Sequence, residues 1–399
     1  MVKKNYELLA PVGDFAMLSA AVNAGADAVY FGLQEFSMRT GSKNFKLEDL
    51  KEIRKVCKKK VKMYLTLNTI IYDNEIVNLE EIIRQIRGKV DAVICWDLSV
   101  IQLCRKYKIP FHISTQASVS NSDAARFYKK LGAKRIVVAR ELNLKQIKEI
   151  SRIIPVEAFV HGAMCVSVSG RCFTSQFLFC KSANRGECIH PCRRSYTIKD
   201  NDEGYELKLE NNKVMSAKDL CMLAYVEKMK KAGITGFKIE GRNRDPRYVD
   251  VVVRNYRKAL DKTLTNQEIK KGMQELENVY NKKFSTGFYL GKVTSKDFSD
   301  IENSAAKEKK HFVGKVTHYF DKVEVAAVKL VSNIEIGDKI VIIGNTTGIV
   351  NSVIKEIQIQ GKKVKEAKKG EEIGIKVPSK VRKNDEMYVL RIKIKKDKK

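Results

Sequence analysis

Five of the nine cysteines in this 399-residue chain lie within one short stretch, from Cys165 to Cys192. Four of them follow the pattern C-x6-C-x15-C-x3-C, and glycine and proline residues among them allow the chain to fold back so that the thiolates converge. A cubane iron–sulfur cluster needs one sulfur at each iron from a different direction, which loops of unequal length can supply. The spacing therefore favours a 4Fe-4S cluster. Its ligands would be Cys165, Cys172, Cys188 and Cys192.

The same cysteines allow two other interpretations. A structural zinc site usually contains C-x2-C or C-x4-C pairs, and only the C-x3-C pair of Cys188 and Cys192 comes close to that spacing. Unligated thiols are the second alternative. Disulfides are disfavoured, because nine is an odd number and because the first residues, MVKKNYELLAPVGD, contain no apolar core of signal-peptide length. We therefore expect a reducing, cytoplasmic location.

The chain is strongly basic, with 76 lysine and arginine residues against 47 acidic residues and a formal net charge of +29. This excess favours a polyanionic partner such as RNA, although a lysine-rich proteome would give the same composition. No apolar run of the sequence approaches the roughly 18 residues of a membrane-spanning helix, so we expect no membrane partner.

Eight short apolar runs alternate with stretches of helical periodicity, which is typical of buried parallel strands joined by helices. The simplest closed arrangement is an α/β fold of the (β/α)8, TIM-like type, and an open doubly wound sheet is the alternative. The runs are ELLAPV from Glu7, DAVYFG from Asp27, MYLTLN from Met63, AVICWD from Ala92, FHISTQ from Phe111, RIVVAR from Arg135, VEAFVHGA from Val156 and GFKIEG from Gly236.

Several of these runs end on polar side chains, and a barrel would present such residues at its active-site mouth. We take His161 and Glu240 as catalytic candidates. A core histidine bonded to the backbone is an equally good interpretation of His161. The candidates for substrate binding are Gln116, Arg140, Lys238 and Arg242.

The domains follow from these patterns. Residues 1–294 are predicted to form the barrel, with the cysteines in an insertion at 164–235 that lies over the barrel mouth. A polar linker is expected at 295–310, followed at 311–399 by a small, basic, antiparallel β-barrel of about six strands. Four arginines flank the cysteines and could offset the charge of a cluster or hold an anionic substrate. They are Arg171, Arg185, Arg193 and Arg194.

Several motifs resemble the collagenase-like peptidase family U32 over roughly residues 6–291. They are ELLAPVGDFAMLSAAVNAGADAVYFG, HGAMCVSVSGRCFTSQ, SANRGECIHPCRRSY, SAKDL, FKIEGRNRDPRYVDVVVRNYRKALD and FSTGFYLG. The C-terminal segments IGDKI and AKKGEEIGI resemble, over a shorter length, the second domain of translation elongation factors.

The resemblance to family U32 implies an activity. Better-understood relatives are oxygen-independent hydroxylases of RNA bases or quinone precursors, with a 4Fe-4S cluster on four cysteines. One branch converts the tRNA wobble uridine to 5-hydroxyuridine with prephenate as hydroxyl donor, and another hydroxylates a cytidine of ribosomal RNA. Matched by position, the ligands here are again Cys165, Cys172, Cys188 and Cys192, with Cys221 in reserve because some relatives use a later cysteine.

We therefore expect an RNA hydroxylase that acts on tRNA rather than ribosomal RNA, with a paralogous protein as a candidate partner. Two other functions stay open. One is an endopeptidase, although the sequence contains neither a G-x-S-x-G nor an H-E-x-x-H motif. The other is an RNA-binding protein whose metal site is only structural.

Overall fold

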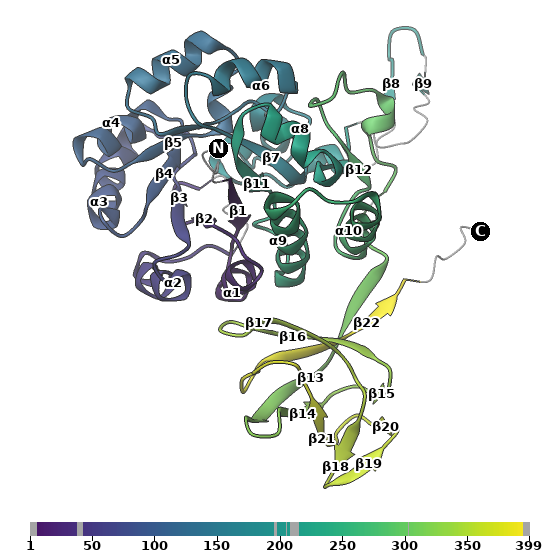
Figure 1. The fold of residues 1–399 in the computed structure, drawn as a ribbon. Helices are drawn as coiled ribbons and strands as arrows, with labels where there is room; N and C mark the ends of the chain where they lie inside the picture. The colour runs from purple at the N-terminus through teal and green to yellow at the C-terminus, as the bar shows by residue number, and fades with distance from the viewer. Residues whose placement is uncertain are drawn as a thin grey trace.

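A computed structural model describes residues 6–37, 43–194, 198–204, 206–207, 215–301 and 303–393. Eight parallel strands follow one another around a closed barrel, because the last of them pairs with the first, at Leu8 and Phe237, and with the seventh, at Phe237 and Ala158 (Figure 1). This confirms the predicted barrel and excludes the open sheet. The strands are β1 (Glu7–Pro11), β2 (Ala28–Gly32), β3 (Lys62–Thr66), β4 (Ala92–Cys95), β5 (Phe111–Ile113), β6 (Arg135–Val137), β7 (Val156–Gly162) and β11 (Ile234–Ile239).

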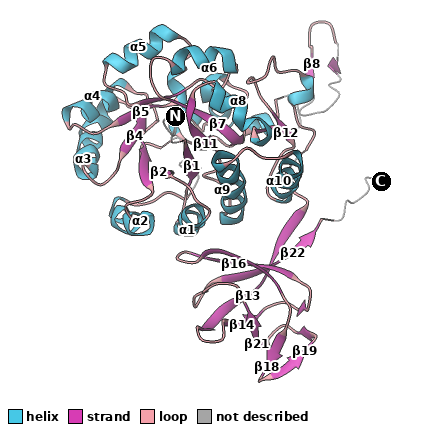
Figure 2. Ribbon diagram, in the orientation of Figure 1, coloured by secondary structure: helices cyan, strands magenta, loops and turns pink. Residues whose placement is uncertain are grey.

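Helices surround the barrel and bury its outer face, as Figure 2 shows with helices in cyan and strands in magenta. They are α1 (Phe15–Asn23), α2 (Leu50–Cys57), α3 (Ile76–Ile86), α4 (Leu98–Lys106), α5 (Ser122–Lys130), α6 (Leu144–Ser151), α8 (Val226–Lys231), α9 (Pro246–Asp261) and α10 (Asn266–Asn278). Helix α9 starts with Pro246 at a position where a missing N–H costs nothing, and Asp245 caps it by accepting from the Tyr248 N–H.

The inside of the barrel holds a buried network of charges. Glu157 is fully buried, and its carboxylate lies 2.8 Å from the Lys238 ammonium and 3.2 Å from the Arg135 guanidinium. Arg135 also pairs with Glu7, which accepts a hydrogen bond from the Tyr64 hydroxyl at 3.0 Å. Buried charges of this kind persist only when they are paired, so these strands are held in register by specific partners as well as by apolar packing.

The cysteine-containing insertion lies between β7 and β11, as the sequence predicts. It includes α7 (Thr174–Phe179), the short pair β8 (Ile198–Lys199) and β9 (Glu206–Leu207), and β10 (Asp219–Cys221). Strand β10 runs antiparallel to β7, with Cys221 opposite His161, and pairs on its other side with β12 (Phe284–Ser285). The insertion is therefore anchored to the barrel wall at its C-terminal end.

The C-terminal region is an antiparallel sheet of eight strands in the order β17-β16-β22-β13-β14-β21-β18-β19, around its own apolar core. The sequence predicts about six strands. The segment SVIKEIQI, expected as one strand, divides between β17 and β18. The bounds are β13 (Glu308–Phe320), β14 (Val325–Leu330), β16 (Lys339–Gly344), β17 (Gly348–Val353), β18 (Ile357–Ile359), β19 (Lys362–Val364), β21 (Glu372–Lys376) and β22 (Glu386–Ile392), with a separate pair β15 (Ile334–Glu335) and β20 (Glu366–Ala367).

The segment expected as a linker packs against the barrel domain. The Ser299 N–H donates to the Ser216 carbonyl at 2.7 Å, and the Lys218 N–H donates to the Asp297 carbonyl at 2.9 Å. Strand β13 already begins at Glu308, whose carboxylate pairs with Arg247 of α9. These contacts fix the path of the chain between its two regions.

The C-terminal sheet also contacts the barrel through α1. The Ser19 hydroxyl donates to the Asn345 carbonyl at 2.6 Å, and Ala16 packs with Val341 and Ile343 of β16. Among the described residues, no helix is both long and apolar enough to cross a membrane.

Candidate active site at the barrel mouth

A small cavity of about 50 Å³ lies at the C-terminal ends of the barrel strands. The residues predicted to bind substrate all line it, together with the catalytic candidate Glu240: Gln116, Arg140, Lys238 and Arg242. Parallel strands bring their carboxyl ends to one end of a barrel, which explains how residues far apart in the sequence meet here.

Arg242 is held by the loop that follows β2 and by the last residue of β3. Its guanidinium donates to the Ser37 hydroxyl at 2.7 Å and to the Thr66 hydroxyl at 3.1 Å, and it is only 5% exposed. A Cβ atom on Gly32 would lie 2.6 Å from this guanidinium. Gly32, the last residue of β2, is therefore what leaves room for the Arg242 side chain at the mouth.

Arg140 is the mouth residue with spare hydrogen-bonding capacity. Its guanidinium lies over the Phe159 ring, 4.0 Å from the centroid, and donates to the Ala163 carbonyl at 3.2 Å. Its buried Nε has no hydrogen-bond partner among the described residues. An unpaired buried donor is costly, so a ligand that accepts from this nitrogen would be favoured.

Lys238 is buried and paired with a carboxylate, whereas Glu240 is half-buried and faces two cavities. The Lys238 ammonium is buried, contacts the Tyr30 ring at 4.2 Å and is paired with Glu157. Burial is the main reason that the pKa of Lys238 is lowered, against the attraction of Glu157. Glu240 is half-buried, accepts from the Tyr30 hydroxyl at 3.4 Å and lines this cavity and a neighbouring one of about 90 Å³.

His161 does not line the mouth cavity. It is 1% exposed and packs against the rings of Tyr248, Tyr256 and Phe284. Burial, aided by the positive charge of Arg244, lowers the pKa of His161 to about 3, so the ring is neutral at physiological pH. The structure thus gives His161 the surroundings of a core histidine beside the site.

A different cavity, of about 80 Å³, is lined by all four cysteines predicted as cluster ligands: Cys165, Cys172, Cys188 and Cys192. Thr115, Gln116 and Arg140 line both this cavity and the mouth cavity, so the two are adjacent. The insertion therefore brings the cysteines to the barrel mouth, where the sequence predicted them to be.

The four thiols, which we call the cysteine quartet, influence one another electrostatically. Burial is the main cause that raises the pKa of Cys192 to about 11, and the other three thiols add to it while Arg193 opposes it. Burial would also raise the pKa of Cys172, but hydrogen bonds from Ser167 and Thr174 lower it overall. Cys172 therefore loses its proton more easily than an unperturbed cysteine, which favours the thiolate form that binds metals.

The other cysteines lie outside this cavity. Cys180 is exposed and ends α7 in the left-handed conformation, with φ of 53°. The reserve ligand Cys221 is buried in β10, where its sulfur contacts Met273 at 3.6 Å and the Tyr256 hydroxyl at 3.8 Å. Within the described ranges, no three histidine, cysteine, aspartate or glutamate side chains are placed to hold a single metal ion.

The flanking arginines have different positions. Arg193 lines the quartet cavity, and Arg171 reaches the Gln116 carbonyl at 2.7 Å. Arg185 is committed to an ion pair with Glu75, and Arg194 lies over the Phe179 ring, 4.5 Å from its centroid. Of the four, Arg193 is therefore the one placed to offset negative charge in the cavity.

Sequence reasoning missed Asp219, a buried carboxyl on β10. It is 2% exposed, and one of its oxygens has no hydrogen-bond partner among the described residues. Burial raises the pKa of Asp219, against the attraction of Arg244 and Arg193, which both line the small cavity next to Glu240. The motif SAKDL contains this residue, but nothing in the sequence places it beside the mouth.

The model of the family described as peptidase family U32 matches residues 13–299. The chain belongs to peptidase family U32. A collagenase of Porphyromonas gingivalis is 40% identical over 96% of this chain and 97% of its own length. A protein of Bacillus subtilis named tRNA hydroxylation protein P1 is 33% identical over 86% of this chain and 85% of its own.

A third U32 relative is a 23S rRNA 5-hydroxycytidine synthase of Escherichia coli, which is 38% identical over 64% of this chain and 39% of its own length. The names of these relatives indicate an enzyme, and they divide between RNA hydroxylation and proteolysis.

Proposed function

We propose that this U32 protein hydroxylates an RNA base without oxygen, using a 4Fe-4S cluster held by Cys165, Cys172, Cys188 and Cys192. The preferred substrate is the wobble uridine of tRNA, with prephenate as hydroxyl donor, and a ribosomal RNA base is the alternative. The observation that carries the proposal is that the quartet, and none of the other five cysteines, lines a cavity adjacent to the barrel mouth.

The quartet suits a cluster better than a single zinc ion. Zinc at about 2.3 Å from each sulfur would draw four thiolates to one point, with sulfurs about 3.8 Å apart. The quartet shares a cavity without converging on one point. A cubane binds each thiolate through a different iron, so its ligands stand farther apart. When bound, such a cluster supplies one-electron transfer.

The reaction itself balances between base and donor. The base exchanges a ring hydrogen for a hydroxyl group, which removes two electrons from it, and the donor accepts these electrons as its carbon–oxygen bond breaks. A proton takes the place of the hydroxyl on the donor carbon, so no external oxidant is consumed. The half-buried carboxylate of Glu240, which lines the mouth, is the group placed to take the proton from the base.

The mouth arginines suit an anionic donor. Prephenate carries two carboxylates, and a guanidinium can bind a carboxylate through two parallel hydrogen bonds. Arg140 has a buried Nε without a partner among the described residues, and Arg242 lines the same cavity. Because Lys238 is neutralised by Glu157, these two arginines are the cations that we expect to orient the donor.

The proposal is tested first by iron. Protein purified anaerobically should contain about four irons and four acid-labile sulfides per chain, and a variant with all four quartet cysteines changed to serine should contain none. Nucleosides from the RNA of a deletion strain should then lack one hydroxylated base, which the wild-type gene restores. Stoichiometric zinc, or no metal in the wild-type protein, would refute the cluster.

A Cys188→Ala variant separates a redox cluster from a structural one. If the metal is only structural, RNA modification should persist wherever the variant remains folded. Under our proposal, the folded variant fails to restore the hydroxylated base in the deletion strain. Its thermal melting curve, compared with wild type, establishes that it is folded.

A collagen-cleaving peptidase is the second candidate, favoured by the 40% identity to the Porphyromonas gingivalis collagenase. It predicts cleavage of collagen or gelatin by purified protein. Under our proposal neither is cleaved. Cleavage by the iron-free quartet variant at the wild-type rate would make the peptidase the correct function.

A further inference from the structure

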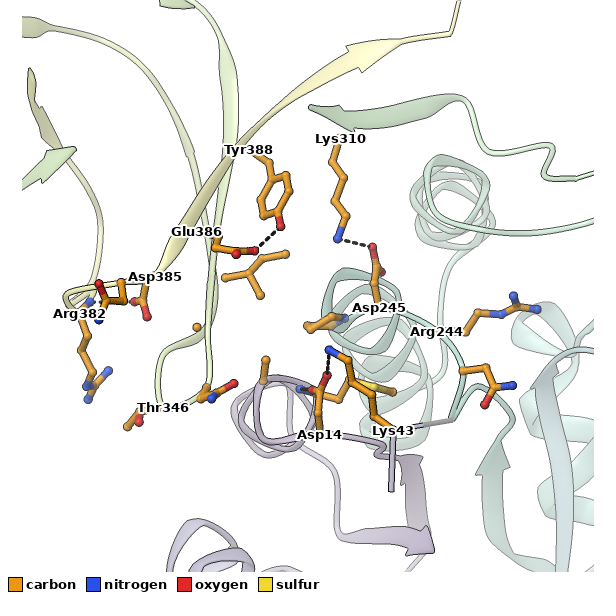
Figure 3. A pocket seen from close by; sticks show the side chains of 18 of the residues that line it. Asp14, Lys43, Arg244, Asp245, Lys310, Thr346, Arg382, Asp385, Glu386 and Tyr388 are labelled. Atoms are coloured by element: carbon orange, nitrogen blue, oxygen red, sulfur yellow. Dashed lines mark hydrogen bonds and ion pairs between the residues drawn. The ribbon is translucent and has the colours of Figure 1, made fainter. Parts of the chain in front are cut away.

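The largest cavity among those described lies between the two regions of the chain, with a volume of about 750 Å³ (Figure 3). On the barrel side it is lined by the loops that follow β1, β2 and β11, which open at the same end of the barrel as the mouth. On the other side it is lined by the turn before β17 and the residues that lead into β22. Its size is within the range of ligand sites, about 300 to 1,000 Å³.

The acidic side chains of this interdomain cleft are already engaged. Asp14 caps α1 and pairs with Lys43 at 3.3 Å, while Asp245 caps α9 and pairs with Lys310 at 2.9 Å. Figure 3 shows both ion pairs as dashed lines. The other two acids, Asp385 and Glu386, accept from the Arg382 N–H and from the Tyr388 hydroxyl.

Three cations of the cleft have no such partner. In the part of the chain that the structure describes, no acidic side chain pairs with Arg244, Arg382 or Lys383. Arg244 lies over the Tyr280 ring, 3.5 Å from its centroid, and the Arg382 guanidinium donates to the Thr347 hydroxyl at 3.0 Å. The cleft therefore presents net positive charge in a concave surface, which concentrates anions.

The cleft is continuous with the candidate active site. Arg242 lines both the cleft and the mouth cavity, and Arg244 lines both the cleft and the small cavity that contains Glu240. The four residues that follow Glu240 thus lead from the mouth into the cleft. A molecule that extends out of the mouth along this segment enters a positively charged channel.

We propose that the interdomain cleft binds the sugar–phosphate backbone of a single-stranded RNA segment whose target base occupies the barrel mouth. This inference rests on the proposed function and adds the C-terminal sheet to the substrate-binding surface. A base must leave its stack to enter a buried site, so the nucleotides beside it are single-stranded and their phosphates need cationic partners nearby.

The test uses two cations on the C-terminal side of the cleft, Arg382 and Lys383, neither of which lines the mouth cavity. In the 399-residue chain, Arg382 and Lys383 are exposed, so changing both to glutamine should not impair folding. Binding of a fluorescently labelled, mixed-sequence oligoribonucleotide of about 12 nucleotides is measured by anisotropy at several salt concentrations. We expect the double variant to bind on the order of tenfold more weakly, with a salt slope smaller by about 1.4.

The matched control removes the same charges elsewhere. Lys60 and Arg87 are exposed in the loops that precede β3 and β4, at the opposite end of the barrel. Their double glutamine variant should bind RNA as the wild type does. Equal losses of RNA affinity in both variants would indicate that RNA is attracted by the overall charge of the protein. Unchanged RNA affinity in the cleft variant would show that RNA does not occupy the cleft. Either result overturns the inference.

Two further arms separate this inference from the proposed function. Binding needs no turnover, so the cleft is supported or refuted even if the protein hydroxylates no base. The second arm adds polyglutamate of matched charge as a competitor of the RNA. It represents an acidic peptide as the occupant of the cleft. If it displaces the RNA at equal charge concentration, the cleft does not select a nucleic-acid backbone and the inference is wrong.

Discussion

At the scale of single residues, the barrel interior depends on one fully buried carboxylate. Glu157 pairs with both Lys238 and Arg135, the first of which lines the mouth cavity. Without this carboxylate, the buried Lys238 ammonium would lose its ion-pair partner in a medium that solvates charge poorly, while Arg135 would keep its pair with Glu7. The charge pattern of the mouth therefore depends on a residue that substrate does not reach.

Replacing Glu157 with glutamine should destabilise the protein by about 3 to 5 kcal/mol, because it leaves the buried Lys238 ammonium without its paired carboxylate. Urea denaturation followed by far-UV circular dichroism measures this loss. Glu149→Gln is the control, since its ion pair with Arg152 is exposed on both sides and should be worth less than about 1 kcal/mol. Similar losses in the two variants would contradict the buried network.

His161 should make stability depend on pH. Its folded pKa of about 3 lies below its ordinary value of 6.5, so the unfolded chain binds a proton that the folded chain excludes. Above pH 6.5 His161 is neutral in both states and costs the folded protein no stability. As the pH falls toward 3, the unfolded chain gains a proton at His161 and the folded protein loses stability. The stability of wild type should therefore fall more steeply than that of His161→Phe, by about 1.4 kcal/mol per pH unit between about pH 5.5 and 4.

Urea denaturation at several pH values measures both slopes. His112, whose pKa burial also lowers to about 3, is present in both proteins and cancels in the comparison. Parallel slopes would mean that His161 is charged in the folded protein. His161 would then again be a candidate proton donor or acceptor at the site.

At the scale of elements, the insertion between β7 and β11 decides which cysteines reach the mouth. It places Cys188 in the quartet cavity and leaves Cys180, eight residues earlier, exposed at the end of α7. The chain reverses at Cys180 and again at Gly186, both in the left-handed conformation. The position of a cysteine in this path therefore matters more than its distance along the sequence.

Cys188→Ser should lose most of the iron and the visible absorption of anaerobically purified protein, whereas Cys180→Ser should keep both. The reason is that only the first removes a ligand from the cavity. Iron analysis and absorption spectra of the two variants check this, with Cys221→Ser as a test of the reserve position. Equal iron loss in Cys180→Ser would mean that the ligand set is different.

At the scale of the whole molecule, the two regions are held together by close backbone contact. Gly348 begins β17 with φ of 71°, and a Cβ atom there would lie 2.8 Å from the Ala20 nitrogen of α1. Gly361, with φ of 79°, has nothing within 4 Å of the same position. The two glycines share a backbone conformation and differ in what surrounds them.

Gly348→Ala should therefore destabilise the protein by about 1 to 3 kcal/mol more than Gly361→Ala, because only the first forces α1 and β17 apart. Urea unfolding by circular dichroism measures both. Trp96 is the chain's only tryptophan, so its fluorescence reports the barrel separately. Equal losses would show that backbone strain alone determines the cost and that the interdomain contact yields easily.

Much of the barrel could be predicted from the sequence for a local reason. Parallel strands buried on both faces are continuous apolar runs, and all eight were recognisable. Helix α9 is indicated in the sequence by Pro246 at its first position and by Val249, Val252 and Val253 at helical spacing. The spacing C-x6-C-x15-C-x3-C selected four cysteines that line one cavity, whereas the density of cysteines alone would also have included Cys180, which is exposed at the end of α7.

Other features depend on contacts between distant segments, which no local pattern encodes. The sequence offers His161 and Glu240 as equivalent residues at strand ends, yet packing against β10 and α9 buries the first while the second opens into two cavities. The pairing of Glu157 with Lys238 and the buried Asp219 arise only when the strands are arranged around a closed barrel.

The interdomain cleft belongs wholly to tertiary structure. Arg244 on the barrel side and Arg382 and Lys383 on the other side lie more than a hundred residues apart in the chain, and none of the three stands out in the sequence. The sequence by itself determined the fold class, the family and the chemistry available in one cysteine-rich loop, because these depend on local composition and order. Tertiary structure decided which charges are neutralised and which remain for a substrate, because neutralisation requires partners to meet in space.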